Sequence, residues 1–203
     1  NMEKLFEPNK RIDEIEKKYN LKKTDFIISF IGTIGMAHGL EVVLKAAKQI
    51  QNEENITFII IGEGSNKEDL EEKSKEMKLD NVLFLSSQSW QEIININQIV
   101  SVKLVHLINT PLFEKVIPSK IFESMALRKP IIMGVNGESN HIIQNANCGF
   151  SMVPEDPISL INTINKFRSN KTIIKKMADD GHKYVLKHYD LKVLAKKMLL
   201  FIR

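Results

Sequence analysis

The sequence FIISFIGTIGMAHGLEVVLKAAKQI, residues 26–50, contains the pattern that decides the fold. Phe26–Ile31 is a short apolar run, typical of a strand that is buried on both faces. A loop with three glycines, residues 32–39, follows this run. The next residues place one apolar face on a helix, at Leu40, Val43, Leu44, Ala47 and Ile50. The stretch therefore predicts a strand–loop–helix unit of an α/β protein.

Similar units recur along the chain. Further strands are expected at residues 56–61, 82–85, 100–107, 130–134 and 149–153. Helical patterns fill the gaps at residues 68–77, 90–96, 119–127 and 138–146, and Asp156-Pro157 marks another helix start. The strand at 100–107 is the least regular, because Ser101, Lys103 and His106 interrupt it. Together the units predict a Rossmann-like, doubly wound parallel sheet of about six strands, with helices on both faces and right-handed crossovers.

The sequence divides into two parts. Residues 1–21 are predicted to be a linker with a short helix at 11–19. Residues 22–203 are predicted to form one domain with a helical tail that starts at Lys171. The opening residues NMEKLFEP resemble the interior of a longer chain more than a start.

Composition excludes several classes of protein. The 203 residues carry a net charge of +4, and the lysines alternate with glutamates, which is typical of solvated helix faces and not of a nucleic-acid site. The single cysteine, Cys148, permits no intrachain disulfide and indicates a reducing compartment. Its apolar surroundings predict a core residue. No run approaches the ~18 apolar residues of a membrane span.

A ligand site is expected where two loops converge. Open parallel sheets bind ligands beyond the carboxyl ends of their strands, at the switch point of the strand order. For the order 3-2-1-4-5-6, this point lies between the first and fourth strands. The loops at residues 32–39 and 109–118 meet there.

The first loop allows two interpretations. Glycines let a backbone approach a phosphate closely, or they simply permit a tight turn. Gly32 and Gly35 are three residues apart, which departs from the G-x-G-x-x-G pattern of dinucleotide oxidoreductases. Glu63, after the second strand, would suit a ribose ligand of that class, but Gly62 and Gly64 on either side also suit a turn.

The second loop leads into IPSKIFE, residues 117–123. Proline followed by Ser119 predicts a helix start with a serine cap. Lys120 is a cation at the positive end of this helix, which is unfavourable unless an anion shares the site. Glu123 falls on the same face as Ser119, one turn further on. The alternatives are a lysine that reaches into solvent and an ordinary surface glutamate.

At these residues the chain resembles the carboxy-terminal domain of retaining glycosyltransferases of the GT-B architecture, family 4. The resemblance is closest to bacterial enzymes that transfer N-acetylated amino sugars in surface polysaccharide synthesis. It rests on five stretches, from about Asn1 to about Tyr189: NMEKLFEP, GTIGMAHGLEVVLKAA, IIIGEGSNKEDL, IPSKIFESMALRKPII and NCGFSMVPEDPISL.

The resemblance implies roles for individual residues. Glu123 matches the second glutamate of the family's E-x7-E motif, which holds the donor ribose. The residues implied to bind the nucleotide are Gly35, His38, Ser87, Gln88, Ser119, Lys120, Ile121 and Glu123. The diphosphate would lie on the amides near Ser119–Ile121 and on the Gly35 loop, and the base near Ser87 and Gln88. Gly137 and Glu138 would approach the donor sugar.

The sequence departs from the family pattern at several places. Lys115 stands at the first E-x7-E position, which contacts the donor sugar in the family. Thr33 and His38 replace the basic pair of the first loop, so Lys120 is expected to supply the missing charge. His38 is interpreted as a phosphate donor or as a loop residue.

The implied reaction moves a glycosyl group from a nucleoside diphosphate sugar, UDP-linked in this prediction, to an acceptor hydroxyl. No cofactor or metal is expected, because no Asp-x-Asp pair is present. The expected partners are the nucleotide-sugar donor and an amino-terminal acceptor domain, with no nucleic acid. An acceptor linked to a lipid would place the protein in the cytoplasm, peripheral on the inner face of the membrane. A sugar-nucleotide epimerase and a non-catalytic nucleotide-binding module are the alternatives.

Overall fold

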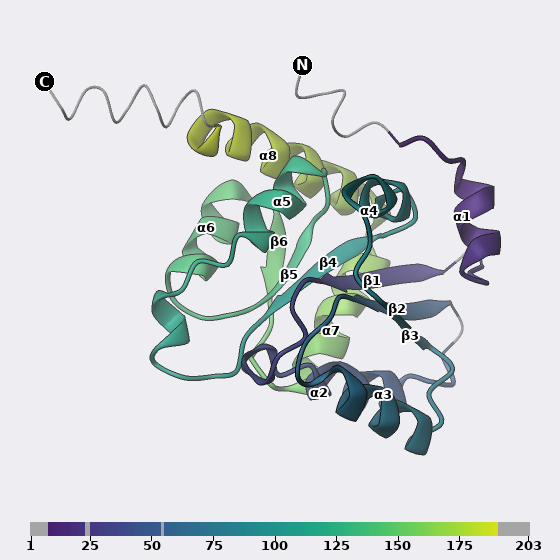
Figure 1. The fold of residues 1–203 in the computed structure, drawn as a ribbon. Helices are drawn as coiled ribbons and strands as arrows, with labels where there is room; N and C mark the ends of the chain where they lie inside the picture. Colours follow the sequence, from purple (N-terminus) through teal and green to yellow (C-terminus); the bar gives the residue numbers. More distant parts are fainter. Residues whose placement is uncertain (1–7, 23–24, 54, 191–203) are drawn as a thin grey trace, which may run out of the picture.

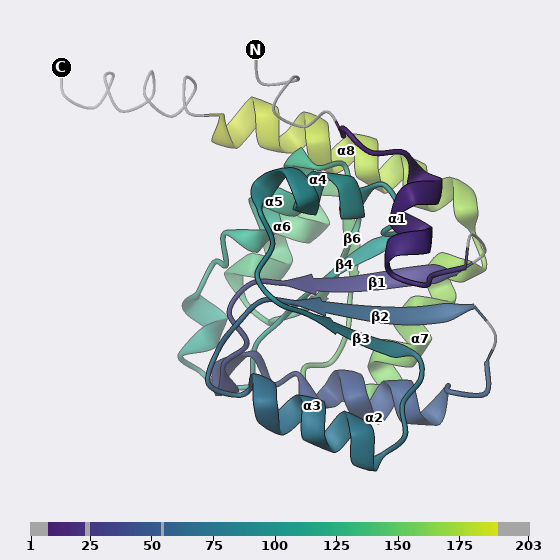
Figure 2. The ribbon, with the colours of Figure 1, turned by 45° about the vertical axis from the view of Figure 1, so that its right-hand side comes forward.

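A computed structural model describes residues 8–22, 25–53 and 55–190. Six parallel strands form one sheet in the order β3-β2-β1-β4-β5-β6 (Figures 1 and 2). The strands are β1 Phe26–Ile31, β2 Ile56–Ile61, β3 Val82–Leu85, β4 Val102–His106, β5 Ile131–Gly134 and β6 Gly149–Ser151. The predicted doubly wound fold and strand order are confirmed.

Eight α-helices and two short 3-10 turns connect and cover the strands within the described residues. The helices are α1 Ile12–Lys18, α2 Glu41–Gln49, α3 Lys67–Glu76, α4 Trp90–Asn97, α5 Lys120–Ala126, α6 Glu138–Ala146, α7 Pro157–Arg168 and α8 Lys171–Tyr189. The 3-10 turns are η2 Met36–His38 and η3 Phe113–Lys115. As predicted, Asp156 caps α7, since its carboxylate accepts hydrogen bonds from the amides of Ile158 and Ser159.

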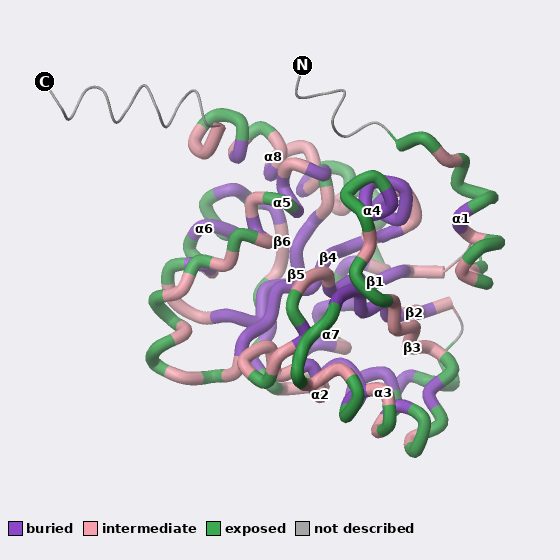
Figure 3. Tube along the Cα trace, viewed as in Figure 1, coloured by how far each residue is buried: buried purple, intermediate pink, exposed green. Residues whose placement is uncertain are grey.

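The core lies on both faces of the sheet. One face packs its aliphatic side chains against α2, α3 and α7, and the other packs against α1, α4, α5, α6 and α8 (Figure 2). The four central strands β1, β2, β4 and β5 are buried along most of their length, whereas the edge strands β3 and β6 are only partly buried and the outer face of α3 is exposed (Figure 3). Cys148 is a core residue as predicted: it is fully buried, and burial raises the pKa of its thiol to about 12.

Strand β4 is shorter than predicted but more buried. It runs over five residues instead of eight, and all five are buried, including Lys103 and His106. The two polar side chains do not interrupt the strand because each faces a particular polar environment inside the protein, described below.

The tail after residue 170 forms one 19-residue helix, α8, up to Tyr189. It packs on α5, α6 and α7. The last predicted part of the tail, residues 191–203, lies outside the described residues. No helix in the described part of the chain is long and apolar enough to span a bilayer.

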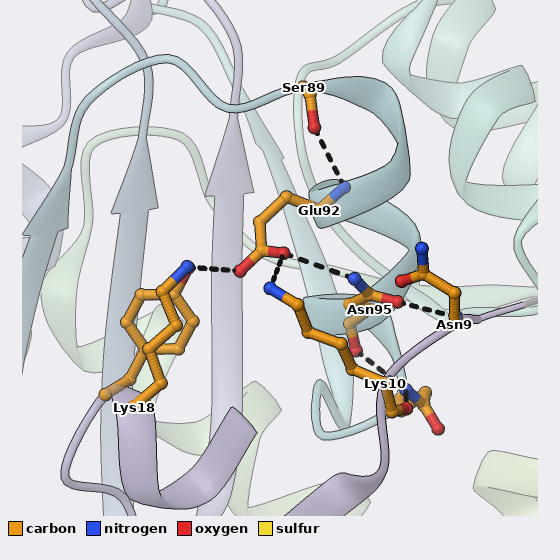
Figure 4. Close-up of polar contacts among 8 residues, drawn as sticks. Asn9, Lys10, Lys18, Ser89, Glu92 and Asn95 are labelled. Atoms are coloured by element: carbon orange, nitrogen blue, oxygen red, sulfur yellow. Dashed lines mark hydrogen bonds and ion pairs between the residues drawn. The ribbon is translucent and has the colours of Figure 1, made fainter. Parts of the chain in front are cut away.

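Helix α1 is attached to α4 through one buried carboxylate (Figure 4). Glu92 is 8% exposed and accepts hydrogen bonds from Lys10 at 2.7 Å, Lys18 at 2.6 Å and Tyr19 at 2.8 Å. Asn95, one turn further along α4, also donates to it. Burial alone would raise the pKa of Glu92, but these hydrogen bonds outweigh burial and hold the pKa well below its ordinary value.

We expect Glu92→Gln to lower the free energy of unfolding by about 1–3 kcal/mol at pH 7, because hydrogen bonds to a charged group are lost. The folded-state pKa is depressed, so the contribution of Glu92 is complete above the ordinary carboxyl pKa of about 4.3 and is lost as the pH falls below it. Urea unfolding between pH 3 and pH 7 measures both effects. The exposed Glu14 of α1 provides the control, Glu14→Gln, and an equal loss in both variants would contradict the prediction.

Candidate functional site

The carboxyl ends of β1 and β4 lie side by side, because these strands pair directly at the switch point of the sheet. The loop after β1 contains η2, and the loop after β4 contains η3 and leads into α5. These two loops meet at the same end of the sheet (Figure 1). The sequence therefore predicted correctly that these two loops converge.

Backbone contacts fix the first loop. Gly32 and Gly62 have φ values of +140° and +151°, and a Cβ on Gly62 would lie 1.9 Å from the carbonyl oxygen of Gly32. The amide of Ile34 donates to the carbonyl of Glu63 at 2.8 Å. The loops after β1 and β2 thus pack backbone against backbone, which only glycine permits at Gly62.

Lys120 lies between the two loops. Its aliphatic stem covers Gly32, where a Cβ would lie 2.3 Å from Lys120 Cε. Its Nζ lies 3.3 Å from His38 Nε2 and 5.2 Å from the centre of the Phe30 ring. Burial lowers the pKa of Lys120, and the Glu123 carboxylate offsets part of this effect. The structure therefore places a half-buried cation where the sequence predicted one.

His38 serves Lys120 as a neutral acceptor. Burial, together with the nearby Lys120 charge, lowers the pKa of His38 to about 4. The imidazole is therefore uncharged at neutral pH, and its Nε2 accepts a hydrogen bond from the ammonium group of Lys120. The positive charge next to this loop therefore comes from α5.

The start of α5 differs from the prediction in its hydrogen bonds. Ser119 precedes the helix, but its hydroxyl does not cap it and instead donates to Glu123 Oε1 at 3.1 Å. The capping prediction is wrong because Ser119 has helical φ and ψ values, which point its side chain along the helix. The Ile121 amide donates to the Pro118 carbonyl. Among the described residues, the amides of Ser119 and Lys120 donate to no other group.

A groove of about 370 Å³ adjoins Lys120 at the ends of β1, β2 and β3. It is lined by Ile31, Gly32, Thr33, Ile61, Gly62, Glu63, Ser87, Gln88 and Ile93. The Glu63 carboxylate is held at its edge by Lys67 at 3.0 Å and by the Ser87 amide at 3.2 Å. Glu63 thus stabilises a turn and orients the loop that carries Ser87 and Gln88. Two hollows larger than this groove lie at the opposite ends of the strands.

The three residues predicted to approach the donor sugar lie on neighbouring loops. Lys115 ends η3 and is exposed, and Glu138 is exposed at the first turn of α6. Gly137 has a φ of +75°, and a Cβ there would lie 2.1 Å from the carbonyl oxygen of Glu114. This backbone contact brings the loops after β4 and β5 together.

His106 is a part of the site that the sequence did not reveal. It is 1% exposed at the end of β4, and its Nε2 accepts a hydrogen bond from the Glu155 amide at 2.9 Å. Nδ1 must then carry the proton, and it donates to the His38 carbonyl at 2.7 Å. Burial lowers the pKa of His106, which favours this neutral form. One imidazole therefore ties the loop after β1 to the loop after β6.

A comparison with protein families shows which family the chain belongs to. The pattern of the family described as "Glycosyl transferases group 1" matches residues 11–199. The chain belongs to this glycosyltransferase family. The match favours a transferase over an epimerase or a non-catalytic nucleotide-binding module.

Known proteins similar to this glycosyltransferase chain agree with the family. The probable glycosyltransferase WbjE of Pseudomonas aeruginosa is 29% identical over 147 residues, which cover 69% of the chain and 35% of WbjE. The crystal structure of Anabaena HepE with UDP has a TM-score of 0.83 at 14% identity, over 98% of the chain and 54% of HepE. The carboxy-terminal domain of the group 1 protein LpcC of Francisella tularensis has a TM-score of 0.70 at 19% identity.

These comparisons also show how much of each similar protein the chain matches. The chain spans about a third of WbjE and about half of HepE. Its match to the LpcC carboxy-terminal domain covers 93% of this chain and 97% of that domain. The fold of the described residues is thus that of one half of a GT-B glycosyltransferase.

Proposed function

We propose that this chain binds a nucleoside diphosphate sugar, with UDP as its nucleotide, and presents the sugar for transfer to an acceptor hydroxyl. The observation that carries the proposal is the placement of Lys120 where the two loops meet, with Glu123 one turn further along α5. Family membership supports a sugar transfer. The HepE complexes with UDP, and with UDP and glucose, support UDP as the nucleotide.

In this proposal the diphosphate lies against Lys120, the free amides of Ser119 and Lys120, and the loop around Gly35. His38 contributes by orienting Lys120. The Glu123 carboxylate accepts hydrogen bonds from the ribose hydroxyls, replacing the one that it now accepts from Ser119. The base occupies the groove beside Ser87 and Gln88. Lys115, Gly137 and Glu138 are proposed to face the sugar.

The chemistry follows from the charge that develops. The acceptor oxygen forms a bond to the anomeric carbon and gives up its hydroxyl proton, while the bond from this carbon to the diphosphate oxygen breaks. The diphosphate leaves with the electron pair and takes up that proton. A half-buried ammonium group and backbone amides stabilise this growing negative charge more strongly than water does. We propose that an acceptor domain, in addition to the described residues, supplies the acceptor and excludes water.

The biological setting is proposed from the resemblance to enzymes of surface polysaccharide synthesis. An acceptor linked to a lipid, with N-acetylated amino sugars as donors, fits that setting. It implies a cytoplasmic protein that is peripheral on the inner face of the membrane. Nucleic acid is not among the proposed partners.

Titration calorimetry with UDP, GDP and NAD tests the proposed function. We expect the chain to bind UDP more tightly than GDP and to show no binding of NAD. Binding of NAD without binding of UDP would refute the proposal.

Glu123→Ala is expected to weaken UDP binding by about 1–3 kcal/mol, because the ribose hydroxyls lose a charged acceptor. Calorimetry at pH 7 measures the change, and circular dichroism checks the fold. Glu72 is an exposed glutamate on α3, remote from the site, so Glu72→Ala is the matched control. An unchanged affinity in folded Glu123→Ala would make Glu123 an ordinary surface residue.

We expect EDTA to leave UDP binding unchanged. The adjacent carboxylates Asp179 and Asp180 are held on α8, where Asp179 pairs with Arg128 at 2.7 Å and Asp180 accepts a hydrogen bond from Asn147 at 2.9 Å. Calorimetry with EDTA, and then with added Mg²⁺ or Mn²⁺, measures the effect. An absolute need for either ion would show that another carboxylate serves the diphosphate.

A further inference from the structure

Strand β4 carries a lysine in the interior of the protein. Lys103 is 6% exposed, and its Cα pairs with that of Ser29 on β1. Its neighbours Val102 and Leu104 pack in the core on the α2 and α7 face, so Lys103 faces the side of α4 and α5. Ser29 is fully buried, and its hydroxyl has no hydrogen-bond partner in the part of the chain that the structure describes.

Both side chains line a cavity of about 130 Å³. Its other walls are Ile31, Trp90, Ile93, Leu104, Lys120, Glu123, Ser124 and Leu127. The floor holds Ser29 and Lys103, and the exposed Glu123 is on α5, next to Lys120. A polar cavity holds a water molecule when it offers about 10–15 Å³ and two to four polar partners. This cavity has the space for water, and Ser29, Lys103 and Glu123 supply polar groups among walls that are mainly apolar.

Burial and the charges around Lys103 determine the pKa of its ammonium group. Burial and, to a smaller extent, the Lys129 charge lower the pKa of Lys103, the Glu123 carboxylate opposes both effects, and the resulting pKa is about 8. Among residues 8–22, 25–53 and 55–190, its Nζ donates no hydrogen bond. Lys120 of α5 faces the same cavity, while α4 contributes the uncharged Trp90 and Ile93. A buried ammonium group is costly unless it is paired, and Glu123 is the anion that acts on it.

We propose that Lys103 is a positioning residue for Glu123: through water held in the cavity that both side chains line, it keeps the carboxylate aimed at the ribose hydroxyls. Lys103 would thereby determine the preference of the site for ribose over deoxyribose. This inference rests on the proposed function. A direct effect of Lys103 on the diphosphate would differ, because it would strengthen the binding of ribose and deoxyribose nucleotides equally.

The variant Lys103→Met tests the proposal. Methionine has a similar length, and replacing a buried charge by an apolar side chain is compatible with folding, which a thermal melt verifies. Calorimetry gives the dissociation constants of UDP and 2′-deoxy-UDP. We expect the variant to bind UDP about five- to tenfold more weakly, with a smaller loss for 2′-deoxy-UDP, which keeps only one of the two hydroxyls, so that discrimination falls.

Lys129 provides the matched control. Its pKa is also lowered by burial to about 8, but its Nζ donates to the Val100 carbonyl at 2.6 Å and it does not line the cavity. We expect Lys129→Met to keep the ratio of the two affinities. In the wild type, the preference for UDP over 2′-deoxy-UDP should fall as the pH rises through about 8, because Lys103 loses its charge there. In Lys103→Met this preference should stay constant between pH 7 and pH 9.

The outcomes separate this inference from the proposed function. If the wild type binds UDP and Lys103→Met keeps the wild-type ratio of the UDP and 2′-deoxy-UDP affinities, the inference alone is overturned. Equal weakening of both nucleotides would also overturn it. A wild type that binds no UDP would overturn the proposed function and the inference with it.

Discussion

Gly62→Ala should lower the free energy of unfolding by about 2–5 kcal/mol, combining backbone strain with overpacking. The φ of Gly62, +151°, is one that residues with a Cβ rarely adopt, and the new methyl group would lie 1.9 Å from the Gly32 carbonyl oxygen. This neighbour is backbone in the loop after β1, so it cannot move without displacing that loop. Chemical denaturation measures the loss of stability.

Gly35→Ala is the matched control, from the same cluster of loops. Gly35 has a φ of −115°, and the atom nearest to an added Cβ is His38 Nδ1 at 3.9 Å. We expect the free energy of unfolding of Gly35→Ala to stay within about 1 kcal/mol of wild type. A small gain is the expected direction, since alanine restricts the unfolded chain. A similar loss in both variants would mean that close backbone packing at Gly62 does not hold the two loops together.

Lys120→Met should weaken UDP binding by about 2–3 kcal/mol, or 30- to 150-fold. The ammonium group is half-buried and oriented by His38, so it has already lost much of its water and can bind a diphosphate at little further cost. The fold should be retained, because a charge unfavourable to the positive end of α5 is removed. Calorimetry at two salt concentrations measures the affinity.

Lys115→Met is the control for charge alone. Lys115 is an exposed lysine on η3, proposed to face the sugar, which UDP lacks. Its removal should leave the UDP affinity within about twofold, the scale of an exposed and screened charge. If both variants lost the same affinity, the site would attract the nucleotide by net charge, without a specific contact from Lys120.

The sequence predicted the fold well because its signals are local. The strand at Ile56–Ile61 and the helix start at Asp156 can each be recognised from fewer than ten residues of sequence. Parallel strands joined by helices then leave few possible topologies. The order of the strands then indicated which two loops converge. Lys120 and Glu123 could be singled out because both lie in one helical turn.

The contacts that sequence reasoning missed join distant segments. The partners of His106 are backbone groups of residues 38 and 155, whose positions no side-chain pattern reveals. The attachment of α1 to Glu92 joins residues 74 to 82 apart. The hydroxyl of Ser119 was assigned to a cap because its type suits one, although its backbone angles direct it to Glu123 instead.

The imidazole of His106 has a consequence for how such a domain can vary. It supplies one donor and one acceptor on opposite sides, and it ties segments 68 and 49 residues away to the end of β4. A loop transplanted from a related protein would have to present its backbone carbonyl or amide to the same ring. The loops after β1 and β6 therefore form, with His106, a single exchangeable module, and a chimaera that swaps one of them alone would leave a buried polar group orphaned.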